Sequence, residues 1–390
     1  MTSDELSGDQ TSREMLPHLE RGGLGQIVLV LQGGGALGAY QVGVYEAMKD
    51  AGVEPDWVIG TSIGAINAAI IAGNKPADRM PKLREFWERV RYDFFAETMR
   101  MMPFTGGLGG VGATMFRGLE AFFTPNPWAW LGPHAGVGAE QAAYYSVEPL
   151  RRTLSDLIDL DYLHGGAPRL TVGAAAVATG EMRYFDSRNE RLEIDHVLAS
   201  GALPPAFPPV RIDGELYWDG GIVSNTPVEA VFDDNPRRDG IVFAVHIWNP
   251  QGTEPDSLWE VATRHKDIQY ASRSATHIAR QKQIHKLRHV ITELVGKLPD
   301  DMRADPSVRS LAAYGCVTRL HVVRLLAPPL YGEDHSKDVD FSEASIHARW
   351  RCGYADTARV LAAQPWLGDF DPLEGFILHE TAAGNVIKEG

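Results

Sequence analysis

The chain has 390 residues, enough for one large domain or two smaller ones, and its 44% apolar and 23% charged residues are typical of a globular protein. Its formal net charge of −14 argues against a nucleic-acid partner and against broad electrostatic docking on anionic lipid. The two cysteines, Cys316 and Cys352, lie far apart in the sequence without the spacing of a metal site. We expect both to be reduced, in a cytoplasmic protein.

Residues 1–25 are polar and acidic and lack the basic and apolar segments of a secretion leader, so we expect a disordered tail. No apolar run reaches the roughly 20 residues that span a bilayer. A lipid substrate would therefore be met from solution, through peripheral and transient contact with a membrane or lipid surface at most.

Strands and helices alternate through the first part of the chain. The apolar run 26–31 predicts a buried strand, and a glycine-rich turn separates it from a helix at 39–51. A second strand at 57–59 leads through another turn into a helix at 63–72 that is apolar on almost all sides. Later segments repeat these patterns, with a helix at 79–91 and strands at 170–177, 210–212, 215–218 and 241–247. This order predicts an α/β fold of three layers, in which helices cover both faces of a mainly parallel central sheet.

Two segments differ from this core, which we expect to span 26–255. Residues 94–145 are rich in glycine, methionine and aromatic residues, which predicts either a lid or acyl-chain channel or an insertion packed on the core. Residues 256–390 are mostly polar and helical in pattern, with one strand at 320–325. We expect them to form an accessory C-terminal region.

The second turn carries a serine between two glycines, as Gly60-x-Ser62-x-Gly64, where a strand passes into a helix. Turns of this type lift a nucleophilic hydroxyl out at the edge of a parallel sheet. The helix that follows directs its N-terminus at the serine, which favours negative charge there. Ser62 is therefore the candidate nucleophile.

The first turn contains the glycines Gly33, Gly34, Gly35 and Gly38. Its neighbouring backbone N–H groups lie at the end of the adjacent strand, where they are able to stabilise the oxyanion that forms on a carbonyl under attack. A serine also needs a base. Asp219 is the candidate base, because it directly follows the strand at 215–218.

Gly220 and Gly221 directly follow Asp219 and leave room for a substrate to approach its carboxylate. An aspartate at its reference pKa of about 3.9 is a weak base. Burial in a pocket would raise that pKa, and a hydrogen bond to the serine would orient the carboxylate.

These three motifs, with the proline-rich segment 199–209, together resemble the patatin-like phospholipases over 26–248. That family consists of lipid acyl hydrolases with a Ser–Asp dyad. The resemblance implies a patatin-like core, with Ser62 as nucleophile, Asp219 as base and the Gly33–Gly35 turn as oxyanion hole, and it implies neither metal nor organic cofactor. The residues after 256 are similar to the extra C-terminal region of a bacterial subgroup.

The implied activity is hydrolysis of carboxylic esters of lipids through an acyl-serine intermediate. The substrate would be a lysophospholipid, a phospholipid or a neutral ester. The glycine turn departs from the family at Leu37, where an arginine or lysine is common. A cation that would face a phosphate is therefore missing from this turn, which keeps neutral esters, lysolipids and short polyester fragments as alternatives.

Other interpretations of the motifs remain. The glycine turn also satisfies a dinucleotide fingerprint, but that fingerprint needs an acidic residue at the end of the second strand, and Asp56 precedes the strand instead. A Ser–Asp–His triad of an α/β-hydrolase-type esterase would use His246, which lies inside an apolar run typical of the core. A protein that merely coats a lipid surface through 94–145 is the non-enzymatic alternative.

The remaining histidines favour structural roles. His196 precedes the 199–209 segment on an expected helix, where a buried structural role is the more common outcome. His285 and His289 are four residues apart on an expected helix, but no acidic companion makes them a metal site, and we interpret them as a solvated helix face.

Overall fold

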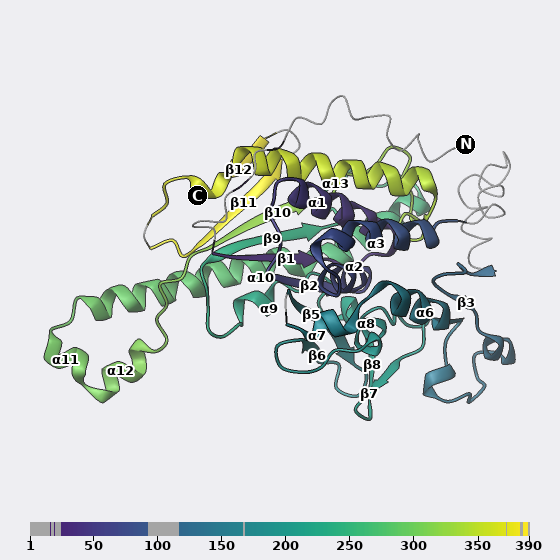
Figure 1. Ribbon diagram of the computed structural model, residues 1–390, viewed down its shortest axis with the longest axis horizontal. Coiled ribbons are helices and arrows are strands. Elements are labelled where there is room, and N and C mark those ends of the chain that lie inside the picture. Colours follow the sequence, from purple (N-terminus) through teal and green to yellow (C-terminus); the bar gives the residue numbers. More distant parts are fainter. Residues whose placement is uncertain are drawn as a thin grey trace.

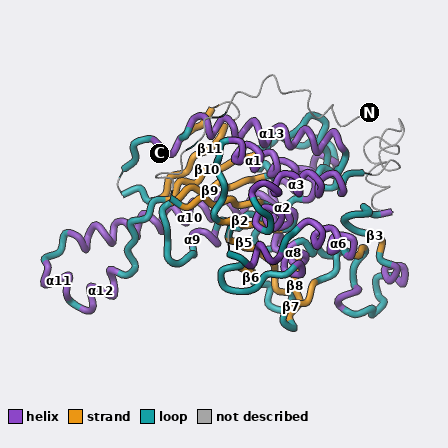
Figure 2. Tube along the Cα trace, viewed as in Figure 1, coloured by secondary structure: helices purple, strands orange, loops and turns teal. Residues whose placement is uncertain are grey.

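A computed structural model of the chain describes residues 16, 19, 25–92, 117–166, 168–371, 373–382 and 385–388. The expected tail at 1–25 lies almost entirely outside the described residues, as does the 94–116 part of the glycine- and aromatic-rich insert. A ten-stranded sheet runs through the molecule, and helices lie on both of its faces (Figures 1 and 2). The predicted three-layer α/β architecture is confirmed.

The sheet has the strand order β12-β11-β10-β9-β1-β2-β5-β8-β7, with β6 paired to β5. Along the sheet, the successive neighbours β11, β10, β9, β1, β2 and β5 pair in parallel. The strands β12, β6, β8 and β7 pair antiparallel with their neighbours. The strands of this sheet are β1 (Gln26–Leu31), β2 (Trp57–Thr61), β5 (Arg169–Ala176), β6 (Met182–Asp186), β7 (Val210–Ile212), β8 (Glu215–Asp219), β9 (Gly240–His246), β10 (Leu320–Leu326), β11 (Phe376–Ala382) and β12 (Asn385–Lys388). A separate pair joins β3 (Thr124–Pro125) to β4 (Tyr145–Ser146).

The described helices include long ones that cover the sheet and short ones in its connections. They are α1 (Ala39–Asp50), α2 (Ile63–Ala72), α3 (Pro76–Arg89), α6 (Glu148–Leu157), α7 (Leu160–His164), α8 (Ile194–Ser200), α9 (Glu229–Phe232), α10 (Leu258–Gly296), α11 (Asp300–Ala304), α12 (Pro306–Ala312) and α13 (Glu343–Ala363). The end of α10 extends beyond the sheet and carries α11 and α12 at its tip (Figure 1). The long strands and helices expected from the sequence are all present, with ends shifted by a few residues.

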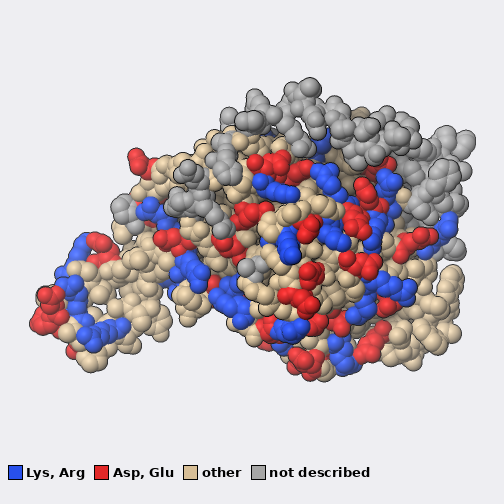
Figure 3. Space-filling model, in the orientation of Figure 1, with Lys and Arg blue, Asp and Glu red and all other residues tan. Residues whose placement is uncertain are grey.

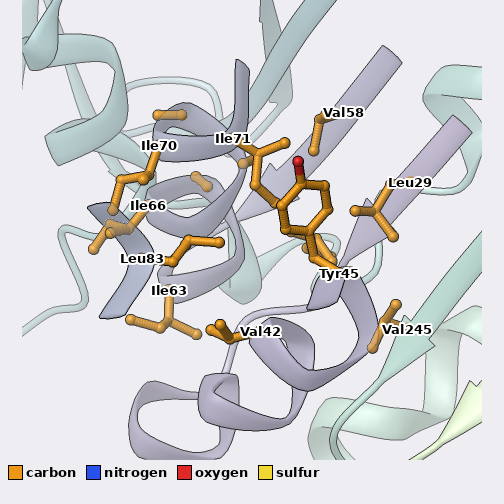
Figure 4. Packing of buried hydrophobic residues seen from close by; sticks show 14 of the residues in the cluster. Leu29, Val42, Tyr45, Val58, Ile63, Ile66, Ile70, Ile71, Leu83 and Val245 are labelled. Carbon is orange, nitrogen blue, oxygen red and sulfur yellow. The ribbon is translucent and has the colours of Figure 1, made fainter. Parts of the chain in front are cut away.

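Alternation along the central strands divides the apolar side chains between two cores. Leu29 of β1 and Val245 of β9 face one core, with Tyr45 of α1 and helix α2 (Figure 4). The preceding residue of each strand, Val28 of β1 and Ala244 of β9, faces the other core, which is formed with α9 and α10. Because both faces of these strands are buried, their sequences read as continuous apolar runs, as expected for a parallel sheet covered on both sides.

The C-terminal residues continue this sheet. Strand β10 pairs in parallel with β9, so that Val323 lies opposite Phe243, and β11 pairs with β10. Helix α13 lies along α1 (Figure 1). The two helices approach so closely that a Cβ on Gly43 would lie 1.9 Å from the carbonyl oxygen of Trp350. Division of the chain into a core at 26–255 and an accessory region at 256–390 stays a prediction, but the two segments share one sheet.

The contact between α1 and α13 gives a direct test of this shared core. Gly43→Ala places a methyl group against the backbone of α13, and we expect overpacking to lower the free energy of unfolding by about 1–3 kcal/mol. Thermal or urea unfolding measures the change. Gly296→Ala is the matched helical control, because a Cβ there meets no atom within 4 Å. Equal stability of the two variants would contradict close packing of these helices.

Candidate active site

Ser62 lies in a sharp turn between the end of β2 and the start of α2. Its backbone has φ 56° and ψ −125°, a strained combination for a residue with a side chain. The flanking glycines make the turn possible, because a Cβ on Gly60 would lie 2.2 Å from the carbonyl oxygen of Gly64. A Cβ on Gly64 would likewise lie 2.2 Å from the carbonyl oxygen of Leu31. The structure thus contains the strand-turn-helix geometry that the sequence predicts, with Ser62 partly exposed.

The glycine turn after β1 lies beside this serine. Parallel pairing of β1 and β2 brings Leu31 opposite Gly60, so both turns emerge at the same edge of the sheet. A Cβ on Gly33 would lie 3.0 Å from the Cβ of Ser62. Gly38 packs against the start of α2, where a Cβ would lie 2.7 Å from Ile63. The predicted proximity of the two turns is therefore observed.

The three glycine amides of this turn differ. The N–H of Gly33 donates to the carbonyl oxygen of Asn225 at 3.1 Å, so it already has an acceptor. Within the part of the chain that the structure describes, the N–H groups of Gly34 and Gly35 donate to no protein atom, and both residues are partly exposed. Two of the three predicted oxyanion donors are thus available to a ligand.

Asp219 ends β8, opposite Ala174 of β5, and its side chain is buried. The N–H of Gly221 donates to its Oδ1 at 2.7 Å, and the Ser62 side chain lies near enough to the carboxylate to affect its pKa. Burial raises the pKa of Asp219 to about 6, although the Gly221 hydrogen bond and the nearby Ser62 side chain act to lower it. The structure therefore brings Ser62 and Asp219 together, from segments more than 150 residues apart in the sequence.

Ser200 contacts the Ser62 turn, and the sequence alone did not indicate it. Its hydroxyl oxygen accepts from the N–H of Ser62 at 3.0 Å, and the hydroxyl donates to the carbonyl oxygen of Gly173 at 2.6 Å. Ser200 ends α8 inside the 199–209 segment, so the family resemblance was a signal that could have found it. Gly220 packs on the same strand, since its Cβ would lie 2.4 Å from the Gly173 oxygen.

The histidines lie elsewhere. His246 is buried at the end of β9, and β1 separates that strand from β2, a lateral distance of about 10 Å. Burial and the nearby charge of Arg324 lower the pKa of His246 to about 3, which keeps it neutral at physiological pH. His196 is buried at the start of α8, where its Nδ1 accepts from the N–H of Glu193.

The expected solvated face at His285 and His289 is wrong. Both side chains are buried, and each Nε2 lies 2.9 Å from the carbonyl oxygen of Thr318. They pack there because the strand β10 begins beside α10, which the periodicity of one helix does not reveal. Among the described residues, no group of three or more histidine, cysteine, aspartate or glutamate side chains is arranged to hold a metal ion.

Asp56 and Leu37 also occupy structural positions. The Asp56 carboxylate accepts from the N–H of Ile27 at 2.9 Å, at the start of β1 and therefore at the edge of the sheet opposite the glycine turn. Leu37 is buried in the core. Neither side chain is placed to contact a ligand at Gly34 or Ser62.

The described part of the insert packs partly on the core and partly into solvent. Phe122 and Phe123 contact Phe207 of the 199–209 segment, with ring centroids 6.1 and 5.6 Å apart. Trp128 and Trp130 are 54% and 77% exposed. Whether the insert acts as a lid stays a prediction.

A small cavity adjoins the Asp219 loop. Its lining residues include Gly221, Ile222 and Tyr270, and its volume is about 50 Å³. Pockets for drug-sized ligands are larger, about 300–1,000 Å³. This cavity accommodates a few water molecules rather than an acyl chain.

Comparison with known proteins identifies the family. Residues 29–232 match a family described as patatin-like phospholipase. The chain belongs to this family. Residues 268–373 match a second family, described as patatin phospholipase, so the region beyond the first match also has relatives of the same kind.

Several curated proteins align with the first region. Patatin-like phospholipase domain-containing protein 6 of Mus musculus is 26% identical over 204 residues, and neuropathy target esterase sws of Drosophila melanogaster is 25% identical over 207 residues. These alignments cover 52% and 53% of this chain but only 12% of each relative. The chain thus spans a small part of the length of these relatives.

Two solved structures are also similar. VipD from Legionella pneumophila is 16% identical, covering 93% of this chain and 73% of its own, with a TM-score of 0.37. ExoU, in its heterodimeric complex with SpcU from Pseudomonas aeruginosa, is 19% identical, covering 76% of this chain and 59% of its own, with a TM-score of 0.27. Family membership rests on the sequence match. No helix among the described residues is long and apolar enough to cross a membrane.

The raised pKa of Asp219 predicts a pH-dependent effect on stability. The pKa of Asp219 in the folded protein is about 6, above the usual aspartate value of about 3.9, so ionisation of this carboxyl lowers the free energy of unfolding as pH rises from about 4 to 6. Asp219→Asn keeps the acceptor for Gly221 and removes the buried charge. We expect it to raise the free energy of unfolding at pH 7.5 by about 2–3 kcal/mol, with little effect at pH 4.

Asp186→Asn is the control of opposite sign for this measurement. Hydrogen bonds from Arg169 and Thr171 outweigh burial and lower the pKa of Asp186. That variant should therefore lose stability at pH 7.5. Urea unfolding at pH 4 and pH 7.5 distinguishes the two variants. A lower free energy of unfolding for Asp219→Asn than for wild type at pH 7.5 would contradict the claim that the ionised Asp219 carboxylate destabilises the fold.

Proposed function

We propose that this protein is a serine acyl hydrolase that cleaves carboxylic esters of lipids through a Ser62–Asp219 dyad. The observation that carries the proposal is the buried carboxylate of Asp219, which lies beside the Ser62 side chain and has a pKa of about 6. A general base works best with a pKa near the operating pH. Family membership and relatives named phospholipase and esterase support the same class of reaction.

In the proposed acylation, Asp219 removes the proton of the Ser62 hydroxyl while Oγ attacks the ester carbonyl. The oxyanion accepts hydrogen bonds from the available N–H groups of Gly34 and Gly35, and the N-terminus of α2 favours its charge. The tetrahedral intermediate collapses, the alkoxide leaves, and the proton on Asp219 passes to it. The acyl group is then attached to Ser62.

In the proposed deacylation, Asp219 accepts a proton from a water molecule, whose oxygen attacks the acyl carbon. The second tetrahedral intermediate releases the carboxylic acid, and Ser62 regains its proton. Each half-reaction uses the same base and the same oxyanion donors. All of these groups belong to the chain itself.

The electrostatics near the glycine turn favour an uncharged or zwitterionic ester over a strongly anionic one. Leu37 replaces the common cation, and the neighbouring lysines are paired with carboxylates: Lys266 with Asp338 at 2.8 Å and Lys337 with Asp267 at 2.6 Å. Positive and negative side chains are interspersed on the face in Figure 3 rather than gathered by sign. We therefore propose neutral lipid esters and lysolipids as the preferred substrates, met by transient contact with a lipid surface.

The dyad is tested by substitution and labelling. Ser62→Ala and Asp219→Asn should each lower kcat on p-nitrophenyl esters at least 1,000-fold, since the nucleophile or its base is lost. A fluorophosphonate should label the wild type at Ser62 with one equivalent, measured by intact mass. Absence of labelling in folded wild-type protein would contradict enzymatic activity and favour a lipid-surface coat.

His246→Ala separates the dyad from a triad in the same assay. We expect it to retain kcat near the wild-type value, because His246 lies on β9, two strands from β2. Near-full activity of Asp219→Asn together with loss in His246→Ala would overturn the dyad. A panel of neutral esters, lysolipids, diacyl phospholipids and hydroxybutyrate oligomers, with Ser62→Ala as blank, identifies the substrate class.

The pH dependence of the reaction gives an independent test. The base acts only when ionised, so kcat/KM should fall about tenfold per pH unit below the pKa of Asp219, about 6, and reach a plateau above it. Initial rates between pH 4.5 and 8.5 measure the profile. An acid limb centred near the ordinary aspartate pKa would contradict the role of the buried carboxylate.

A further inference from the structure

The carbonyl oxygen of Gly33 accepts two side-chain hydrogen bonds at the back of the glycine turn. Asn225 Nδ2 donates to it at 3.1 Å and Trp248 Nε1 at 2.8 Å. A carbonyl oxygen has two lone pairs, so both are used. Trp248 and Asn225 are buried, which makes these bonds a fixed part of the turn rather than a surface contact.

These two bonds determine where the next amide points. The peptide bond between Gly33 and Gly34 is not one of the cis bonds of the described chain, so its C=O and N–H point in opposite directions. Holding the Gly33 oxygen toward Trp248 therefore directs the Gly34 N–H away from the indole. Among the described residues, this N–H is one of the two amides of the turn without a protein acceptor.

The indole of Trp248 is itself held on several sides. The backbone N–H of Trp248 donates to Gln32 Oε1 at 3.0 Å, and the indole ring stacks on Tyr270 with ring centroids 4.9 Å apart. The ammonium of Lys337 lies 5.6 Å from the ring centroid and is paired with Asp267. A Cβ on Gly34 would lie only 2.7 Å from Trp248 Nε1, so the ring and the turn are in direct contact.

Two of these supporting residues come from the second matched region, 268–373. Tyr270 stacks on the indole, and Lys337 packs over it. The next residue, Asp338, accepts from the N–H of Ala36 through its backbone oxygen at 2.8 Å and is paired with Lys266. The C-terminal region thus contacts both the glycine turn and the side chain that holds it.

We propose that Trp248 is a positioning residue that orients the Gly34 N–H as an oxyanion donor, and that the 268–373 region serves the active site by holding the indole in place. The inference rests on the proposed hydrolase function. Trp248 does not touch the reacting atoms. It acts through the peptide plane between Gly33 and Gly34, and its effect is confined to the transition state, where the oxyanion exists.

Trp248→Phe removes the indole donor and keeps an aromatic ring. We expect kcat on a p-nitrophenyl ester to fall about 10- to 100-fold, with KM within about twofold of wild type, because the Gly34 donor is misplaced but not lost, and loss of a donor costs about 100- to 1,000-fold. Replacement of the Trp248 indole by its benzothiophene isostere, introduced as a noncanonical residue, keeps the ring size and removes only the N–H. It should lower kcat in the same way.

Trp366→Phe is the matched control. Trp366 is buried against Phe243, and its Nε1 finds no acceptor among the described residues. This variant should keep wild-type kcat and KM while losing comparable packing. Thermal unfolding of all variants separates a stability effect from a catalytic one.

The outcomes distinguish the inference from the function on which it rests. A wild-type protein that neither turns over esters nor reacts with the fluorophosphonate overturns the proposed function itself. An active wild type with an isostere variant of unchanged kcat overturns the role of Trp248, even if Trp248→Phe fails to fold. A lowered kcat in the isostere variant, at an unchanged melting temperature, supports it.

Discussion

Parallel pairing of β1 with β2 is the constraint on which the rest of the site depends. It brings the glycine turn and the Ser62 turn to one edge of the sheet and within van der Waals distance of each other. Antiparallel β8 then delivers Asp219 to the same edge, on the far side of β5. A shift of β1 against β2 by one residue would reverse its faces and separate the two turns.

The sequence predicted the parts of this arrangement that are local. Gly60 and Gly64 mark a turn that only glycine allows, and the apolar runs at 26–31 and 241–247 mark strands buried on both faces. The resemblance to a known family supplied the pairing of Ser62 with Asp219. Periodicity by itself did not reveal which strands are neighbours, because pairing in a sheet joins residues far apart in the chain.

What the sequence left out depends on long-range contacts. Ser200 reaches Ser62 only because α8 packs under β5, and Trp248 reaches Gly33 only because β9 lies beside β1. Strand β11 did not stand out before the fold was known, and it enters the sheet through β10. The buried His285 and His289 were misjudged for the same reason, since their acceptor at Thr318 lies on another segment.

The sheet order has a consequence for synthesis on the ribosome. Strand β1, at the N-terminal end of the described sheet, pairs with β9, whose residues follow it by 214 positions in register, as in Gln26 opposite Gly240. At about 5–20 residues per second, translation leaves one edge of β1 without its neighbour for roughly 10–40 s. Asp338, which contacts the glycine turn, and Tyr270, which stacks on Trp248, emerge later still. The nascent polypeptide therefore carries an incomplete hydrolytic centre, and an apolar strand edge open to chaperones, until most of it has left the exit tunnel.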